Sequence, residues 1–272
     1  MERNKGEKAL FNYGKGVDKE EQFFRDHTIL TKQNEKDIET FKKLYAFDRL
    51  NETIVNLSKL YPGIAKFSLN TISDFGNYEN ELSEILFIIL REQENHLKGY
   101  LNKVYNNYQV PIESRTSYSS SNKLKYYFKV PVANHKTIDL RTSETKRSID
   151  FYDMINTLDF GSINTIFMNQ SPSIIKGFSS DPNIVEELDY VRRMRNYVYH
   201  HNLLYSLGKD VLKQSIFFLI KSLPFKADRE LFVKRINELR YKSPNRDHDI
   251  GEEIAITFSK EEEQEICEKE ND

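Results

Sequence analysis

One long helical stretch constrains the fold of this chain more than any other feature. Apolar residues recur at every third or fourth position from Glu79 to Tyr108, which predicts an amphipathic helix of about 30 residues. Its apolar stripe comprises Leu82, Ile85, Leu86, Ile89, Leu97, Leu101 and Val104. Six consecutive polar residues, 91–96, interrupt the stripe. We interpret them either as a solvated or interhelical polar turn, or as a place where a carboxylate supports a site on another helix.

A shortage of turn-forming residues extends the helical expectation to the whole chain. Glycine and proline together supply only 17 of the 272 residues, about 6%, whereas average usage is about 12%. Few turns favour long helices over a many-stranded sandwich or barrel. The 16 Tyr and 18 Phe residues provide enough bulk for a hydrophobic core. We therefore predict a mainly α-helical protein.

The remaining periodicity predicts the other elements. Asp181 and Pro182 form a typical helix start, and Gly208 is a typical helix stop. A short strand is expected at about 125–130, with connecting loops at 64–79 and 171–181. Further helices are expected at about 31–60, 148–158, 161–169, 182–206, 210–223 and 228–241.

Composition divides the chain into three regions. Residues 1–74 form an N-terminal helical region, and residues 75–245 form a helical domain with a mixed-structure insertion at about 109–147. Residues 246–272 form an acidic tail, whose last 13 residues carry a net charge of −5. We expect this tail to be solvated and disordered.

Several classes of protein are excluded by composition. The single cysteine, Cys267, rules out an internal disulfide framework and a cysteine-based zinc cluster. The longest apolar run, 85–90, is far shorter than the roughly 18–20 residues of a membrane span. The first residues show no apolar segment of signal-peptide length. We expect a cytoplasmic protein with no metal, no cofactor and no membrane partner.

The helix expected at 182–206 carries the polar residues of greatest interest. At 100° per residue, one buried line contains Ile184, Leu188, Val191, Val198 and Tyr205. Arg195 and Asn202 fall on this same line, and a buried arginine must be paired or must use its charge. Asn196 and His200 share a different face because they are four residues apart.

In an ideal helix Arg195 and His200 point about 140° apart. One phosphate can still meet both if the helix is distorted near His200 and His201, or if two copies of the chain form a composite site. We favour the second arrangement, because two-fold dimers are the commonest assemblies. A metal site is the rival use of the two histidines, but adjacent helical positions diverge by about 100°.

The motif helix resembles a known superfamily. Residues 195–200, RNYVYH, resemble the R-N-x-x-x-H form of the motif found in the metal-independent HEPN ribonucleases. With His201 and Leu203, the string resembles Abi-like abortive-infection proteins of the AbiD and AbiF group. Residues 159–163, DFGSI, resemble a turn of this family, and residues 90–98 more weakly resemble a segment of its first helix. The resemblance covers about 75–240 and implies a HEPN-like helical bundle with an N-terminal helical extension.

This resemblance implies a metal-independent endoribonuclease of a bacterial anti-phage system, working as a homodimer. Arg195, Asn196 and His200 are the implied catalytic residues, with His201 and Glu94 in support. Histidine exchanges protons near neutral pH, and arginine presents planar donors to a phosphate. Attack by the ribose 2′-OH is expected to leave 2′,3′-cyclic phosphate and 5′-OH ends.

Two other functions remain open at this stage. The first is a non-cleaving HEPN-type RNA-binding or regulatory protein that holds a structured noncoding RNA. The second is a purely structural helical interaction protein. The purified protein distinguishes these three functions. A nuclease degrades RNA, an RNA-binding protein holds it intact, and a structural protein does not bind it.

The insertion has the composition of an RNA-binding segment. Residues 114–147 carry a net charge of +6 with tyrosines interleaved, a mixture that suits phosphate neutralisation and base stacking, although a solvated charged loop is the alternative. The expected RNA-binding residues are Lys123, Lys125, Lys129, Tyr126, Tyr127, Lys136, Arg141 and, on the motif helix, Arg192 and Arg193. The overall charge of −2 therefore conceals a segregated pattern and does not argue against RNA.

Overall fold

The computed structural model describes residues 19–30, 47–116, 124–131, 137–142, 147–239 and 254–268. The protein is mainly α-helical, as predicted. Its helices are α1 (Lys19–His27), α3 (Phe47–Leu60), α4 (Leu69–Val104), α5 (Phe151–Thr157), α6 (Phe160–Met168), α7 (Pro172–Phe178), α8 (Ile184–Tyr199), α9 (Lys209–Lys221), α10 (Lys226–Glu238) and α12 (Lys260–Cys267), with a 3₁₀ helix, η3 (Leu204–Leu207).

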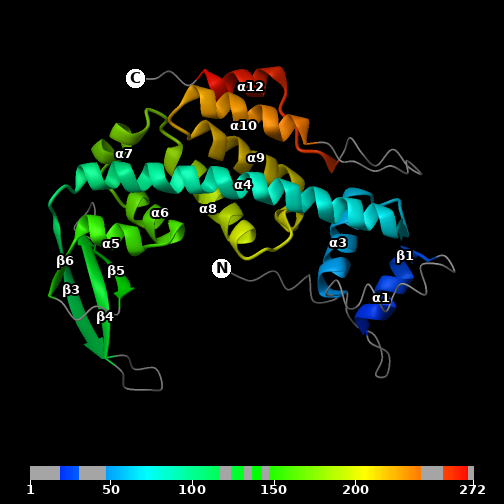
Figure 1. The fold of residues 1–272 in the computed structure, drawn as a ribbon, viewed down its shortest axis with the longest axis horizontal. Coiled ribbons are helices and arrows are strands. Elements are labelled where there is room, and N and C mark those ends of the chain that lie inside the picture. The colour runs from blue at the N-terminus through cyan, green and yellow to red at the C-terminus, as the bar shows by residue number, and fades with distance from the viewer. Residues whose placement is uncertain are drawn as a thin grey trace.

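Helix α4 is the longest element and runs the length of the molecule (Figure 1). Its 36 residues correspond to about 54 Å. The predicted helix is confirmed, but it begins at Leu69, so the expected loop over 64–79 is wrong from that residue onward. Leu69, Ile72 and Phe75 are buried and continue the apolar stripe toward the N-terminus. The helix therefore runs through the boundary expected at 74/75.

The start of α4 and its polar interruption both have a local cause. The Ser68 hydroxyl accepts a hydrogen bond from the Thr71 N–H at 3.1 Å and caps the helix. In the polar turn, Gln93 is fully buried, Glu94 and His96 are half-buried, and Arg91, Glu92 and Asn95 are exposed. The interruption is thus part core and part surface.

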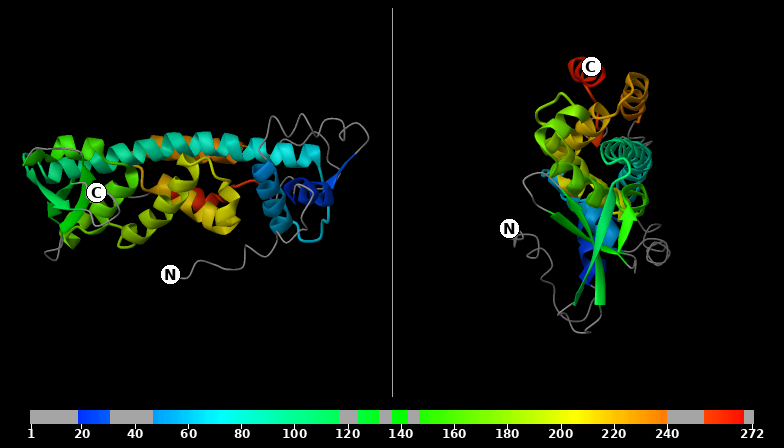
Figure 2. Two further views of the ribbon diagram at one scale, coloured as in Figure 1. Left: turned by 90° about the horizontal axis from the view of Figure 1, so that it is seen from below. Right: turned by 90° about the vertical axis from the view of Figure 1, so that its left-hand side faces the viewer.

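The other elements are arranged along α4 (Figures 1 and 2). Helices α1 and α3 lie near its N-terminal end and the larger sheet lies at its C-terminal end. Helices α5, α6 and α8 lie on the opposite side of α4 from α10 and α12 in Figure 1. Helix α3 confirms the predicted helix over 47–60, and the earlier part of that prediction lies outside the described residues.

The insertion forms a four-stranded antiparallel sheet. The strands are β3 (Gln109–Thr116), β4 (Leu124–Pro131), β5 (Thr137–Thr142) and β6 (Ser148–Asp150), in the order β5-β4-β3-β6. The strand predicted at 125–130 lies within β4. Val110, Phe128 and Val130 are buried, so the sheet contributes to the core. A separate short parallel pair joins β1 (Thr28–Ile29) to β2 (Phe67–Ser68).

A short helix replaces the loop expected at 171–181. Helix α7 forms there because the Phe178 ring packs against Tyr100 and Phe167, and because the Tyr100 hydroxyl donates a hydrogen bond to the Ile174 carbonyl at 2.5 Å. A β-carbon on Gly177 would lie 2.7 Å from that hydroxyl oxygen. A side chain at residue 177 would therefore force the Tyr100 hydroxyl to shift where α7 approaches α4.

The acidic tail is ordered over 254–268, which corrects the expectation of disorder. Ile254, Ile256 and Ile266 are fully buried, and α12 begins with a capping box between Ser259 and Glu262. The charge of this segment predicts disorder, but its few apolar residues supply the packing. Residues 269–272 and 240–253 lie outside the described part of the chain.

Basic residues of the helical domain hold this acidic segment. The Lys221 ammonium lies 3.1 Å from Asp181, 3.5 Å from Glu187 and 3.3 Å from Glu265. The Arg229 side chain is buried and donates to the carbonyls of Leu223 at 2.7 Å and Cys267 at 3.3 Å. These contacts join α12 to α8, α9 and α10.

Candidate functional site at the end of helix α8

The motif helix ends earlier than predicted. Helix α8 stops at Tyr199, and His200 is its C-cap, with its N–H directed at the carbonyls of Asn196 and Val198. His201 has a φ of 53°, in the left-handed region, and this reverses the chain. The helix predicted as far as 206 is therefore broken at the two histidines.

The break has a clear packing reason. Leu203, Leu204 and Tyr205 are all buried, and three consecutive residues cannot lie on one face of a continuous helix. The turn after Tyr199 and the short helix η3 allow all three to enter the core. Asn202, expected on the buried line, is exposed as a result.

Helix α8 presents its polar residues as two neighbouring pairs, each one turn apart. In the first pair, the guanidinium carbon of Arg195 lies 3.9 Å from the centroid of the Tyr199 ring. In the second pair, Asn196 and His200 are both exposed. Guanidinium, amide and imidazole groups therefore gather at the C-terminal end of one helix.

The charge of Arg195 has no carboxylate partner among the described residues. Arg195 is half-buried, and its Nε atom is buried without a hydrogen-bond partner there. Stacking on Tyr199 stabilises the cation while leaving its donors available. The position of Arg195 on the buried line predicts either a paired cation or one whose charge is used in function. Among the described residues, its partner is the aromatic ring of Tyr199.

Glu94 was expected to support the catalytic residues, but it does not pair with Arg195. Its carboxylate forms an ion pair with Lys98 at 2.8 Å, one turn along α4. Glu94 is still close to the site, since burial raises the pKa of the Tyr199 phenol and the charge of Glu94 raises it further, against the charges of Arg195 and Arg91. The Phe87 ring of α4 lies 5.1 Å from the Tyr199 ring, so α4 forms the wall behind the motif.

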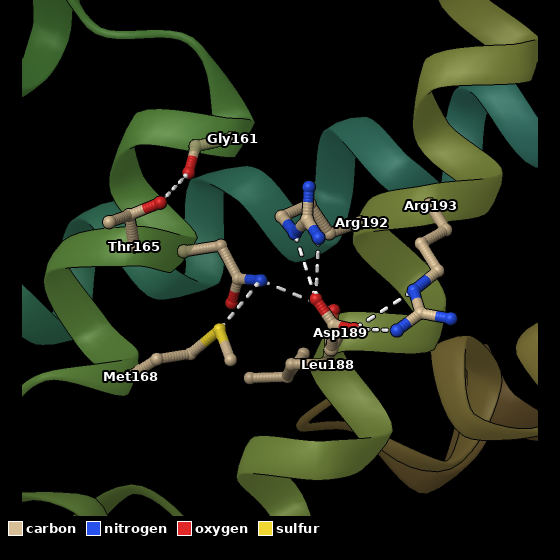
Figure 3. Close-up of polar contacts among 8 residues, drawn as sticks. Gly161, Thr165, Met168, Leu188, Asp189, Arg192 and Arg193 are labelled. Atoms are coloured by element: carbon tan, nitrogen blue, oxygen red, sulfur yellow. Dashed lines mark hydrogen bonds and ion pairs between the residues drawn. The ribbon is translucent and has the colours of Figure 1, made fainter. Parts of the chain in front are cut away.

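The two arginines that precede the motif share one carboxylate (Figure 3). Asp189 accepts hydrogen bonds from Arg192 at 2.7 and 3.0 Å and from Arg193 at 2.9 Å. Burial acts to raise the pKa of Asp189, but these hydrogen bonds and charges outweigh it and lower the pKa below its ordinary value. Both arginines were expected to bind RNA, and together with Asp189 they retain a net charge of +1.

A buried amide ties α6 to α8. Asn164 is fully buried and donates from Nδ2 to the Leu188 carbonyl at 3.2 Å. The DFGSI segment caps α6, since Asp159 accepts a hydrogen bond from the Ser162 N–H at 2.7 Å. Sequence reasoning missed Asn164, although an amide inside an otherwise apolar helix is a detectable pattern.

A buried acid supports the chain immediately after the two histidines. Glu79 is only 2% exposed, and its Oε1 accepts a hydrogen bond from the Tyr205 N–H at 2.9 Å. Burial raises the pKa of Glu79 to about 7, against the opposing effects of the Tyr205 N–H and the Arg49 charge. Glu79 was not among the predicted site residues, because its partner is 126 residues away in the sequence.

Five of the seven residues expected to bind RNA through the insertion lie on its sheet. Tyr127 on β4 is the cross-strand partner of Arg141 on β5, and Tyr126 pairs with Thr142. Lys125 lies on the same strand, β4. The Lys129 ammonium forms an ion pair with Glu113 at 2.5 Å, so part of its charge is compensated. Lys123 and Lys136 lie outside the described residues.

Neither a metal site nor a membrane span is found in the part of the chain that the structure describes. No group of three His, Cys, Asp or Glu side chains is placed there to hold a metal ion. No helix in the same ranges combines the length and apolarity needed to cross a bilayer.

Comparisons with protein-family models, with curated proteins and with solved structures find no match to this chain.

Proposed function

We propose that this protein is a metal-independent endoribonuclease of the HEPN type. The observation that carries the proposal is the arrangement at the end of α8. There, the exposed His200 lies one turn from the exposed Asn196, and Arg195, whose charge has no carboxylate partner among the described residues, precedes Asn196 on the same helix. This arrangement joins a proton-exchanging group to a phosphate-binding cation at the protein surface.

The chemistry follows from the three side chains. The ribose 2′-oxygen attacks the adjacent phosphorus, the bond from phosphorus to the 5′-oxygen breaks, and a 2′,3′-cyclic phosphate and a 5′-OH end result. The imidazole of His200 takes the 2′-OH proton or delivers a proton to the leaving 5′-oxygen. Arg195 stabilises the charge that builds on the phosphate, and Asn196 orients the phosphate or the imidazole.

Cleavage of a defined RNA tests this proposal. With EDTA present, His200→Ala and Arg195→Ala should each lose activity, while Arg235→Ala, an exposed arginine on α10, should keep it. An RNA with 2′-O-methyl groups at every position should resist the wild-type protein. Cleavage by either motif variant, or 3′-phosphate ends that never pass through a cyclic form, would contradict the mechanism.

We further propose that the working form is a homodimer with a composite site. Phe87 and Ile88 of α4 are large apolar residues that are 44% and 41% exposed, and Phe87 contacts Tyr199 of the motif. An exposed apolar pair beside polar functional groups is typical of an interface. The dimer brings the Arg195 of one chain to the His200 of the other.

Mixing two inactive variants tests the composite site. If each site takes Arg195 from one chain and His200 from the other, a heterodimer of Arg195→Ala and His200→Ala contains one intact site. Activity should then return to roughly a quarter of the wild-type value after equal mixing and exchange. A dimer that shows no such recovery places both groups of each site on the same chain.

One observation favours the second candidate function, an RNA-binding or regulatory protein that does not cut. Arg195 is half-buried and stacked on Tyr199, a position that also suits a structural role. In that case the purified protein retains intact RNA, and His200→Ala leaves the bound RNA unchanged. An anti-phage role is proposed from the sequence resemblance alone, and infection of cells expressing the wild type or His200→Ala tests it.

A further inference from the structure

A polar cleft opens at the C-terminal end of α4, where this helix meets the sheet. Its volume is about 500 Å³, and it lies between the C-terminal end of α4 and the start of α5. Three asparagines, Asn102, Asn106 and Asn107, line it with Lys103, Asp150 and Tyr152. None of these residues belongs to the site at the end of α8.

One wall of the cleft is rigid. Tyr105, which also lines it, stacks on Phe151 with 4.6 Å between ring centroids and donates its hydroxyl to Gln170 at 2.6 Å. Asn107 has a φ of 62°, which turns the chain sharply from α4 toward β3. The Phe151 N–H bonds to the Tyr108 carbonyl at 2.9 Å and closes this turn against α5.

Two groups in the cleft lack the contacts that such groups usually make. The Tyr152 side chain is 62% exposed, and no other aromatic ring in the described ranges stacks on it. The Oδ1 atom of Asn102 is buried and has no hydrogen-bond partner within the same ranges. The exposed aromatic face of Tyr152 suits a flat ligand.

Two charged side chains of the cleft can contact the other parts of such a ligand. Asp150 is held in position because its carboxylate accepts hydrogen bonds from the Tyr152 N–H at 2.9 Å and from Gln109 at 3.1 Å. Each carboxylate oxygen can accept a further hydrogen bond. The exposed Lys103 provides a cation for a phosphate at the rim.

We propose that this cleft binds one unstacked nucleotide of a single-stranded RNA, an inference that rests on the RNA-directed function proposed above. The base stacks on Tyr152, its amino group donates to Asp150, and its phosphate lies on Lys103. Cytosine, adenine and guanine carry an exocyclic amino group and uracil does not, so the cleft disfavours uridine.

The position of the cleft gives it a role in holding substrate rather than in cleaving it. Lys103 is 16 residues along α4 from Phe87, the residue that contacts the motif, which corresponds to about 24 Å. The sheet begins at the cleft, since Gln109 pairs with Asp150 across β3 and β6. RNA held here is anchored several nucleotides away from His200, at the base of the basic insertion.

Binding of labelled RNA tests the proposal. The experiment measures the fluorescence anisotropy of 5′-fluorescein-labelled (rC)10 and (rU)10 with the full-length protein carrying His200→Ala, which prevents cleavage. We expect tighter binding of (rC)10. Adding Tyr152→Ala should weaken (rC)10 binding about fivefold or more, the effect of losing one stacked base, whereas Tyr152→Phe should retain it. Lys103→Gln should weaken binding and reduce its salt dependence.

A matched control is available at the N-cap of α10. Phe225 is 67% exposed and lies outside the cleft, so Phe225→Ala should bind (rC)10 as the parent does. Unchanged affinity for Tyr152→Ala, or equal loss for Tyr152→Phe, would overturn the stacking role, and tighter binding of (rU)10 would overturn the amino-group contact.

The inference and the proposed function fail in different ways. If wild-type protein cleaves RNA but Tyr152→Ala binds normally, the cleft proposal alone is wrong. If Tyr152→Ala weakens binding but no cleavage is detected, the nuclease proposal alone is wrong. A protein that binds neither oligonucleotide contradicts both.

Discussion

Removing the charge of Glu79 should change how stability depends on pH. Glu79 is buried beneath the turn that follows His200 and His201, and its pKa of about 7 is far above the ordinary 4.5. The folded protein therefore holds a proton that the unfolded chain releases between about pH 4.5 and 7. By linkage, this group's contribution to stability is fully present below pH 4.5 and is lost as the pH rises through 7.

The size of the effect follows from the two pKa values. The difference between the folded and unfolded pKa values of Glu79 corresponds to roughly 3 kcal/mol of unfolding free energy. Of this, roughly 2 kcal/mol is lost between pH 5 and pH 8. Glu79→Gln keeps an oxygen that accepts the Tyr205 N–H but has no titration. Relative to this variant, wild-type protein should lose roughly 2 kcal/mol of unfolding free energy from pH 5 to pH 8.

Urea unfolding followed by circular dichroism at several pH values measures this difference. Glu81, also on α4, is exposed, so Glu81→Gln should follow the wild-type curve. Parallel curves for wild type and Glu79→Gln would refute the reasoning, because they would mean that Glu79 titrates alike in the folded and unfolded chains. The Arg49 and Glu52 charges act on Glu79 in opposite directions and leave burial as the dominant cause.

Three further perturbations test other parts of the structure. Truncation after residue 253 removes four buried apolar residues, each contributing roughly 1.5–3 kcal/mol, so a large fall in Tm is expected by differential scanning fluorimetry; an unchanged Tm would show that the segment does not pack. Gly177→Ala should cost about 1–3 kcal/mol in urea unfolding because its β-carbon would lie 2.7 Å from the Tyr100 hydroxyl, and a smaller cost is expected when Tyr100→Phe is also present. Asp189→Asn should strengthen RNA binding and steepen its salt dependence by releasing Arg192 and Arg193, and weaker binding in anisotropy titrations would argue that Asp189 positions them.

Local periodicity accounts for what could be predicted of the fold. The α4 stripe, the helices α5, α6, α9 and α10 and the strand in β4 were all visible as residue spacing. The residues at which these elements begin and end were harder to predict from the sequence, because tertiary packing extends or ends a helix. Leu69 and Ile72 lengthen α4 by burial, and the buried run from Leu203 to Tyr205 ends α8.

The candidate site could likewise be predicted only in part from the sequence. The spacing of Arg195, Asn196 and His200 predicted all three on one helix, and the structure has Arg195 and Asn196 in α8 with His200 as its C-cap. The partners of the charged groups could not be predicted, since Glu94 was expected to support the catalytic residues and instead pairs with Lys98. The choice depends on side-chain directions that packing determines.

By itself, the sequence determined the helical class, the apolar face of α4 and the motif at the end of α8, because each depends on spacing along one segment. Only the tertiary structure decided that the acidic tail packs, that Glu79 supports the turn after the histidines and that a polar cleft forms beside the sheet. Such features join residues far apart in the chain, and their stability comes from burial and hydrogen bonding that no local pattern encodes.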